Sequence, residues 1–209
     1  MKRRMLFPSR HSHPGRLPSG FVAVLAAAGV CLTAPVAGAC GYHNPADMAL
    51  GLMNWAYPNA LHVRTAVWQA EDAGILPTRA RTPAKDLFAF NRMLKHLNAL
   101  GNSLNAAGLV DAHRASFAVV QLDSMLWTRF ARTASGYAVE THAASATEGD
   151  VVVVTDGKVI TAMINGSLDA AAAEKYGLLR YYGPDRAQVV VRRALATATA
   201  SASQPKQTF

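Results

Sequence analysis

The hydrophobic period of the chain changes near residue 113, and this change constrains the fold more than any other feature. From Asn44 to His113, apolar residues recur every three or four positions, as on one face of an amphipathic helix. After His113 they alternate with a period of two, in short runs separated by turn residues. Short strands joined by brief turns pair antiparallel. The chain is therefore predicted to be an α+β protein, with N-terminal helices followed by a four- or five-stranded antiparallel sheet covered by short helices.

The segment 40–109 is predicted to be helical. Apolar residues at helical spacing mark three helices, at residues 48–57, 60–74 and 82–108. Gly74 suits the position after a helix, and Thr82-Pro83 suits the start of the next one. Gly101 is expected to be a weak point in the third helix, costing about 1 kcal/mol relative to alanine.

The segment 110–195 is predicted to contain the sheet and its covering helices. The β-rich runs cover residues 116–122, 126–131, 137–143 and 151–155. Helical patterns follow at residues 159–164, 169–176 and 184–195. The remaining residues, 196–209, are rich in alanine, serine and threonine, and a disordered tail is expected there.

Residues 1–39 have the pattern of a signal sequence. Basic residues without any acid precede an apolar stretch from Phe21 to Ala34, and Ala37-Gly38-Ala39 provides small residues for cleavage. The apolar stretch is shorter than the roughly 20 residues of a membrane-spanning helix. We therefore expect an exported protein whose mature form begins at Cys40 and resides in the periplasm or on an envelope membrane.

Cys40 has two alternative roles. The sequence V-A-G-A-C that ends at Cys40 resembles a permissive bacterial lipobox, which implies a lipidated cysteine and attachment to a membrane surface. Alternatively, Cys40 and His43 offer a thiolate and an imidazole to a metal or a redox partner. A structural zinc site needs four ligands, and the other histidines are distant in sequence, so no metal is expected. Acylation would remove the thiolate, so the two roles exclude each other.

The charge distribution argues against a nucleic-acid partner. The chain has 21 Lys and Arg residues and 13 acidic residues, but five of the bases and none of the acids precede Cys40. Residues 40–209 therefore carry a formal net charge of only +3, with the bases scattered along the chain. Nucleic-acid binding needs a clustered basic face.

No catalytic motif is present in the sequence. It contains no G-x-S-x-G elbow, no H-E-x-x-H pair, no P-loop and no G-x-G-x-x-G. Asp111 and His113 lie close together, but no serine or cysteine is placed to complete a triad. We expect a protein that is not an enzyme and needs no cofactor.

The stretch from Val151 to Gly183 resembles the C-terminal half of a sterol-carrier-type domain. That family shows a strand, a short helix, Gly-x-Leu-Asp/Ser, an Ala-rich helix and Gly-x-Leu-x-x-x-Gly before a last helix. The matching positions are Gly166, Leu168, Asp169, Ala173, Gly177, Leu179 and Gly183. The resemblance covers residues 110–195 and implies a space between sheet and helices that holds an acyl chain, sterol or other apolar ligand.

Together these observations predict an exported protein that binds or carries an apolar, lipid-like ligand at the bacterial envelope. Alternating strands bury one face, whereas the Ala-rich helix at 170–173 brings little volume to fill the space opposite. We expect an apolar cavity there, lined by Phe117, Val119, Trp127, Met163, Leu168 and Leu178. The alternatives are a metal- or redox-linked envelope protein that uses Cys40 and His43, and a structural or partner-binding module without a small ligand.

Overall fold

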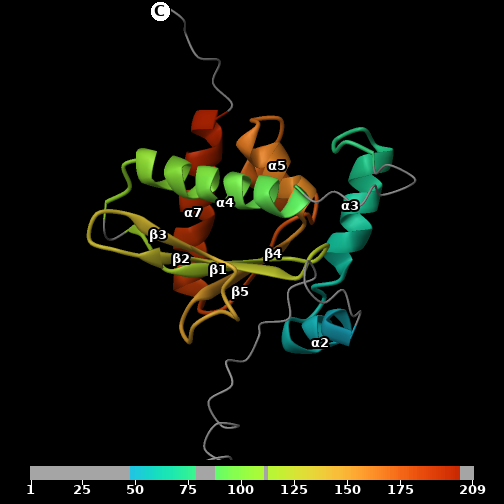
Figure 1. Cartoon of the computed structure of the whole chain (residues 1–209), viewed down its shortest axis with the longest axis horizontal. Helices are drawn as coiled ribbons and strands as arrows, with labels where there is room; N and C mark the ends of the chain where they lie inside the picture. Colours follow the sequence, from blue (N-terminus) through green and yellow to red (C-terminus); the bar gives the residue numbers. More distant parts are fainter. Residues whose placement is uncertain (1–47, 79–87, 111–112, 203–209) are drawn as a thin grey trace, which may run out of the picture. The chain divides into compact units, whose positions relative to one another are not determined.

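Five strands form one mixed sheet in the order β3-β2-β1-β4-β5 (Figure 1). The structure is a computed structural model that describes residues 48–78, 88–110 and 113–202, all within one compact unit, Ala37–Phe209. The strands are β1 (Phe117–Gln121), β2 (Leu126–Arg132), β3 (Tyr137–Thr141), β4 (Val151–Thr155) and β5 (Arg180–Tyr182). Together with the helices, this sheet confirms the predicted α+β class.

The pairing of β1 with β4 is parallel, whereas the other pairings in the sheet are antiparallel. The antiparallel expectation is therefore correct except at the centre of the sheet. β1, β2 and β3 form a meander, and the connection 142–150 then returns the chain to the start of β4 beside β1. Every residue of β1 and β4 is buried, as expected for a central parallel pair covered on both faces.

Helices precede, interrupt and follow the sheet, as the hydrophobic period predicts. The N-terminal helices are α2 (Met48–Ala56), α3 (His62–Asp72) and α4 (Ala89–Ala106), and the later ones are α5 (Gly157–Ile164), α6 (Ala170–Lys175) and α7 (Asp185–Ala202). The predicted start of the third helix at Thr82 lies outside the described residues. Figure 1 shows α4, α5 and α7 on one face of the sheet, called here the helix face.

The register assigns alternate residues of β1 to opposite faces of the sheet. Phe117 lies opposite Phe130, whereas Val120 lies opposite Trp127. The Phe117 and Phe130 rings stack, with their centroids 4.7 Å apart, among the residues of the hydrophobic core. Trp127 lies on the second face, where the ring centroid of Tyr57 is 6.2 Å from its own. Side chains from the connection between α2 and α3 therefore pack against this second face.

Helix α4 approaches the sheet closely at Gly101. A Cβ atom added at this position would collide with the Cγ2 atom of Val139 in β3. The sequence predicts Gly101 only as a weak point in the helix. In the structure, the absence of a side chain lets the helix backbone lie against the strand.

Helix α7 extends past the end that the sequence predicts. It continues from Asp185 to Ala202, so the expected disordered tail is wrong for residues 196–202. Ala198 and Thr199 are 0% and 1% exposed. The Thr199 hydroxyl accepts a hydrogen bond of 3.1 Å from the Ala170 N–H at the start of α6. Tertiary contacts therefore fix as helix a segment whose composition has no strong preference for one structure.

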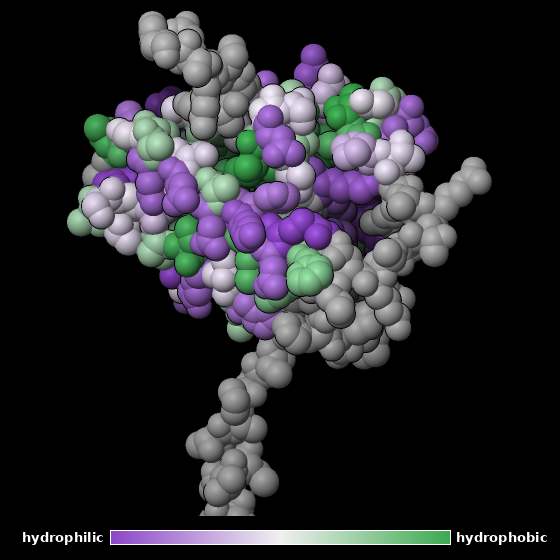
Figure 2. Space-filling view, turned by 45° about the horizontal axis from the view of Figure 1, so that its top comes forward, coloured by the Kyte–Doolittle hydropathy of each residue, from purple (hydrophilic) through white to green (hydrophobic). Residues whose placement is uncertain are grey.

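Polar side chains dominate the helix-covered side, where apolar residues form only small, separate patches (Figure 2). Such scattered apolar residues are ordinary for a protein surface. Among the described residues, we find no helix with both the length and the apolar character needed to cross a bilayer.

Candidate functional site

The structure does not bring the six predicted ligand-binding residues to one surface. Phe117 and Val119 lie on the helix face of β1, whereas Trp127 lies on the opposite face of the sheet. Five of the six are buried members of the hydrophobic core: Phe117, Val119, Met163, Leu168 and Leu178. The sheet thus separates Trp127 from the side chains expected beside it, and a ligand-binding role for the set stays a prediction.

The extension of α7 explains how the small side chains of α6 are packed. The expected cavity required empty space beside Ala173, because alanine has little volume. In the structure, Ala173 is fully buried in the same core cluster as Leu195 and Ala198 of α7. Helices α6 and α7 are in contact, so the part of α7 that the sequence assigns to a disordered tail contributes to the packing here.

Three pockets that share lining residues adjoin one another along the segment 174–182, and two of them are also lined by α3; together they are called here the α3 groove. A middle pocket of about 500 Å3 shares Gly177 and Arg180 with the first end pocket, of about 300 Å3. It shares Ala66, Gln69 and Tyr176 with the second end pocket, of about 280 Å3. These volumes are in or near the range of small-molecule sites, roughly 300–1,000 Å3.

The middle pocket is basic. His62 from α3, Lys175 from α6 and Arg180 from β5 line it, and none of its lining residues is acidic. Its other polar groups are Thr65 and Gln69 on successive turns of α3. The Nε atom of Arg180 is buried without a hydrogen-bond partner. This pocket combines positive charge with an unsatisfied donor.

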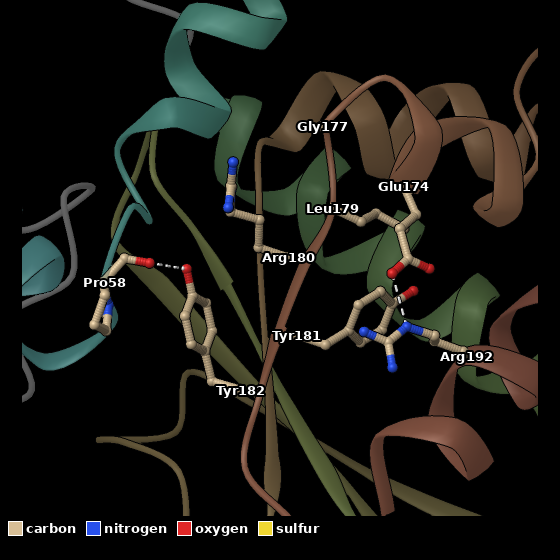
Figure 3. A pocket seen from close by; sticks show the side chains of 8 residues that line it. All are labelled: Pro58, Glu174, Gly177, Leu179, Arg180, Tyr181, Tyr182 and Arg192. Carbon is tan, nitrogen blue, oxygen red and sulfur yellow. Dashed lines mark hydrogen bonds and ion pairs between the residues drawn. The ribbon is translucent and has the colours of Figure 1, made fainter. Parts of the chain in front are cut away.

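The first end pocket is built from tyrosines and an internally paired arginine (Figure 3). Arg192 donates a hydrogen bond of 2.7 Å from Nε to Glu174, and its guanidinium carbon lies 4.6 Å from the ring centroid of Tyr181. Burial raises the pKa of Tyr181, Glu174 raises it further, and Arg192 opposes the shift. Figure 3 shows Arg180 and Tyr182 pointing away from this group, as the alternation of β5 requires.

Tyr182 fixes this end of the groove to the N-terminal helices. Its hydroxyl donates a hydrogen bond of 2.8 Å to the Pro58 carbonyl, and its ring centroid lies 5.3 Å from that of Tyr57. Burial raises the pKa of the Tyr182 hydroxyl, while the nearby Arg180 lowers it. The phenol is thus held in its neutral, donating form beside the Arg180 side chain.

The second end pocket is mainly apolar. Small side chains form its floor because Ala66 and Ala70 of α3 and its C-cap residue Ala73 recur at a spacing of four and three. Ile75 and Tyr176 form the walls, and Gln69 is the polar group at the boundary with the middle pocket. The α3 groove therefore passes from an apolar end through a basic middle to a tyrosine-rich end.

A fourth pocket, of about 240 Å3, lies at the start of α5. Its polar side chains form contacts between helices. Lys158 forms an ion pair with Glu71 of α3 and donates a hydrogen bond to the Pro77 carbonyl. Thr161 lies 3.0 Å from Nδ1 of His96 in α4. These contacts join α3 and α4 to α5.

The α3 groove has only a faint signal in the sequence. The alanine spacing of α3 is visible there, but it is equally typical of ordinary helix packing. His62 is exposed at the start of α3, as is common for a histidine on a helix surface. Arg180 occupies an unspecified position of the family pattern, between Leu179 and Gly183. Only the tertiary structure brings these side chains together.

The described residues contain no group of three histidine, cysteine or acidic side chains positioned to hold a metal ion. Cys40 and His43, the residues of the alternative metal or redox role, lie outside the described residues, as does the predicted signal sequence. Both expectations stay predictions.

Comparisons with known proteins add one similarity. A scan of protein-family models finds no match, and a search of curated proteins finds none either. Among solved structures, the chain is similar to a solution structure of a conserved hypothetical protein from Thermus thermophilus, described as a possible sterol carrier protein. The sequence identity is 16% and the TM-score 0.37, with 58% of this chain and 91% of that chain covered.

Proposed function

We propose that the protein is a non-enzymatic binding or carrier protein for an apolar, lipid-like ligand, and that the ligand lies in the α3 groove. The observation that carries this proposal is the apolar end of the groove, where Ala66 and Ala70 of α3 and its C-cap residue Ala73 line one pocket with Tyr176 and Ile75. Small side chains leave room beside the helix, and the aromatic and branched side chains provide apolar contact area. The proposal agrees with the ligand class implied by the sequence resemblance to sterol-carrier-type domains.

Filling the apolar end tests this proposal. Ala73 is exposed at the end of α3, so Ala73→Trp places a large side chain in the pocket without disturbing the core. We expect this variant to lose binding of a fluorescent fatty acid, measured by fluorescence titration, while its circular dichroism spectrum is unchanged. Asp72→Trp is the matched control, because Asp72 is exposed and does not line the groove. Equal binding by both variants and the wild type would contradict the proposal.

We further propose that the protein acts at the bacterial envelope after export and is attached to a membrane through Cys40. The helix α2 supports a position near a bilayer, because it contains no charged residue and exposes Leu52 by 67% and Trp55 by 87%. Tryptophan and leucine are typical of helices that lie in a membrane interface. Leu52 and Trp55 would follow the lipidated cysteine by 12 and 15 residues.

Membrane fractionation tests this part of the proposal. The wild-type protein is expected in the membrane fraction, and Cys40→Ser is expected to move it to the soluble fraction. A Leu52→Ser/Trp55→Ser variant should weaken, but not abolish, the association of the lipidated protein. Unchanged partitioning of Cys40→Ser would argue for ordinary secretion.

A further inference from the structure

We infer that the middle of the α3 groove is an anion subsite in which Arg180, Lys175 and His62 bind the carboxylate or phosphate group of an amphiphilic ligand. The inference deepens the proposed function and rests on it for the apolar part of the ligand. The anion-binding part rests on the charge and geometry of the middle pocket alone. The subsite joins residues of α3, which lies outside the segment 110–195 that resembles sterol-carrier-type domains, to Lys175 and Arg180 within that segment.

The three basic side chains come from different elements and converge on one space. His62 begins α3, Lys175 ends α6 and Arg180 begins β5. All three line the pocket of about 500 Å3, and its lining contains no carboxylate that could neutralise them. The like charges of Lys175 and Arg180 repel one another, so this arrangement is most favourable when an anion lies between them.

Arg180 has no acidic partner in the described part of the chain, unlike Arg192 and Arg129. Arg192 in the adjoining pocket is paired with Glu174, and Arg129 in β2 is paired with Asp150. No ion pair joins Arg180 to any residue in the described part of the chain, and its Nε is buried without a hydrogen bond. Its neighbour Tyr182 is a neutral phenol, which cannot compensate a full positive charge. A ligand anion would supply both the missing acceptor and the missing charge.

The chemistry of the pocket indicates a planar or tetrahedral oxyanion. A guanidinium presents paired donors that match a carboxylate or phosphate, and an ammonium adds a point charge. Gln69 and Thr65 offer further neutral hydrogen-bonding groups. An anionic group held here would have its apolar chain directed to the adjoining apolar end, because Ala66 and Tyr176 line both pockets.

Three probes of the mature protein test the inference by isothermal titration calorimetry: decanoate, decanol and inorganic phosphate. The wild-type protein is expected to bind decanoate at least about tenfold more tightly than decanol, because decanol lacks the carboxylate that accepts a charge-assisted hydrogen bond. Arg180→Gln should reduce decanoate affinity to that of decanol and leave decanol binding unchanged. Arg193→Gln removes the same charge from an exposed position of α7 outside the groove and should have no effect. Lys175→Gln, at an exposed side chain, gives a second test if Arg180→Gln does not fold.

The possible outcomes distinguish failure of the anion subsite from failure of the proposed apolar-ligand function. Equal affinity of the wild type for decanoate and decanol would overturn the anion subsite and leave the apolar-ligand proposal intact. Binding of phosphate, lost in Arg180→Gln, without binding of either decyl compound would support the subsite and contradict the apolar ligand. Unchanged decanoate affinity in both Arg180→Gln and Lys175→Gln would overturn the subsite.

Discussion

Arg129 of β2 reaches across β1 to form a two-point ion pair with Asp150, just before β4. Its Nε lies 2.7 Å from one carboxylate oxygen, and a terminal nitrogen lies 3.3 Å from the other. Ala118 lies directly opposite Arg129 in the intervening strand. This small side chain leaves room for the guanidinium to cross. The pair connects strands that do not pair with each other directly, so it helps to fix the register at the centre of the sheet.

Removing the charge of Asp150 is expected to destabilise the protein. Asp150 is buried, and its carboxylate also accepts a hydrogen bond of 3.2 Å from the Thr147 N–H. Asp150→Asn leaves the Arg129 guanidinium without its counter-charge, so we expect a loss of about 1–3 kcal/mol in the free energy of unfolding. Urea denaturation measures this loss. Glu148→Gln, at an exposed acid of the same loop, should change stability by less than about 0.5 kcal/mol. A similar effect of both variants would contradict the role of the ion pair.

Gly101→Ala is expected to destabilise the protein although alanine favours helices. The new methyl group would collide with Val139, whose branched side chain has little rotational freedom. Overpacking of this kind costs about 1–3 kcal/mol, which exceeds the gain of about 1 kcal/mol in helix propensity. The double variant Gly101→Ala/Val139→Ala should be more stable than the sum of the single changes predicts. Asn102→Ala, on the exposed side of α4, measures the propensity effect alone. Additive effects would exclude the collision.

Thr199→Val tests whether the C-terminal part of α7 stabilises α6. The Thr199 hydroxyl donates to the Leu195 carbonyl at 2.9 Å while accepting from the Ala170 N–H. Valine keeps the shape but leaves a buried N–H without a partner, which costs about 1–3 kcal/mol. Thr197→Val is the control, because the exposed Thr197 makes the same kind of bond to the Arg193 carbonyl. Equal thermal denaturation midpoints for the two variants would contradict the expectation.

The stability of the protein should fall at alkaline pH, in part because of Tyr181. Burial is the main cause of the raised pKa of Tyr181, so the folded state favours the neutral phenol. Its contribution to stability is complete below the unfolded-state pKa of about 10 and is lost as the pH rises toward the folded-state value. At about pH 11, the wild-type protein is expected to lose about 1.4 kcal/mol of its free energy of unfolding that the Tyr181→Phe variant does not lose. Denaturation at pH 8 and pH 11 should show a smaller decline for Tyr181→Phe than for Tyr176→Phe, whose ring is exposed.

The periodicity of the sequence predicts most elements of the fold, because each amphipathic pattern reports which side of its own element is buried. It cannot report which strands become neighbours. The four-residue valine run 151–154 suits either an antiparallel or a parallel strand, and only the tertiary structure places it beside β1. Likewise, residues 196–202 have a composition without strong preference, and burial of Ala198 against the core decides their structure.

The site is less predictable than the fold for the same physical reason. Apolar character along the chain selects the six predicted ligand residues, but it does not report which face of the sheet each one occupies. The register of β1 and β2 determines that Trp127 faces away from Phe117. Conversely, the groove depends on His62, Lys175 and Arg180, which lie in three different elements. No local pattern connects residues of separate elements.

Helix α7 has a consequence for the order of events during biosynthesis. These 18 residues are the last described element along the chain, yet they contact α4, α5, α6 and β4. A nascent chain that lacks them has only α4 and α5 on the helix face of the sheet and leaves the start of α6 without its acceptor. Until α7 emerges from the ribosome, the polypeptide cannot complete its core. On the proposed export route, this delay would keep the chain an unfolded substrate for the translocation machinery during most of its synthesis.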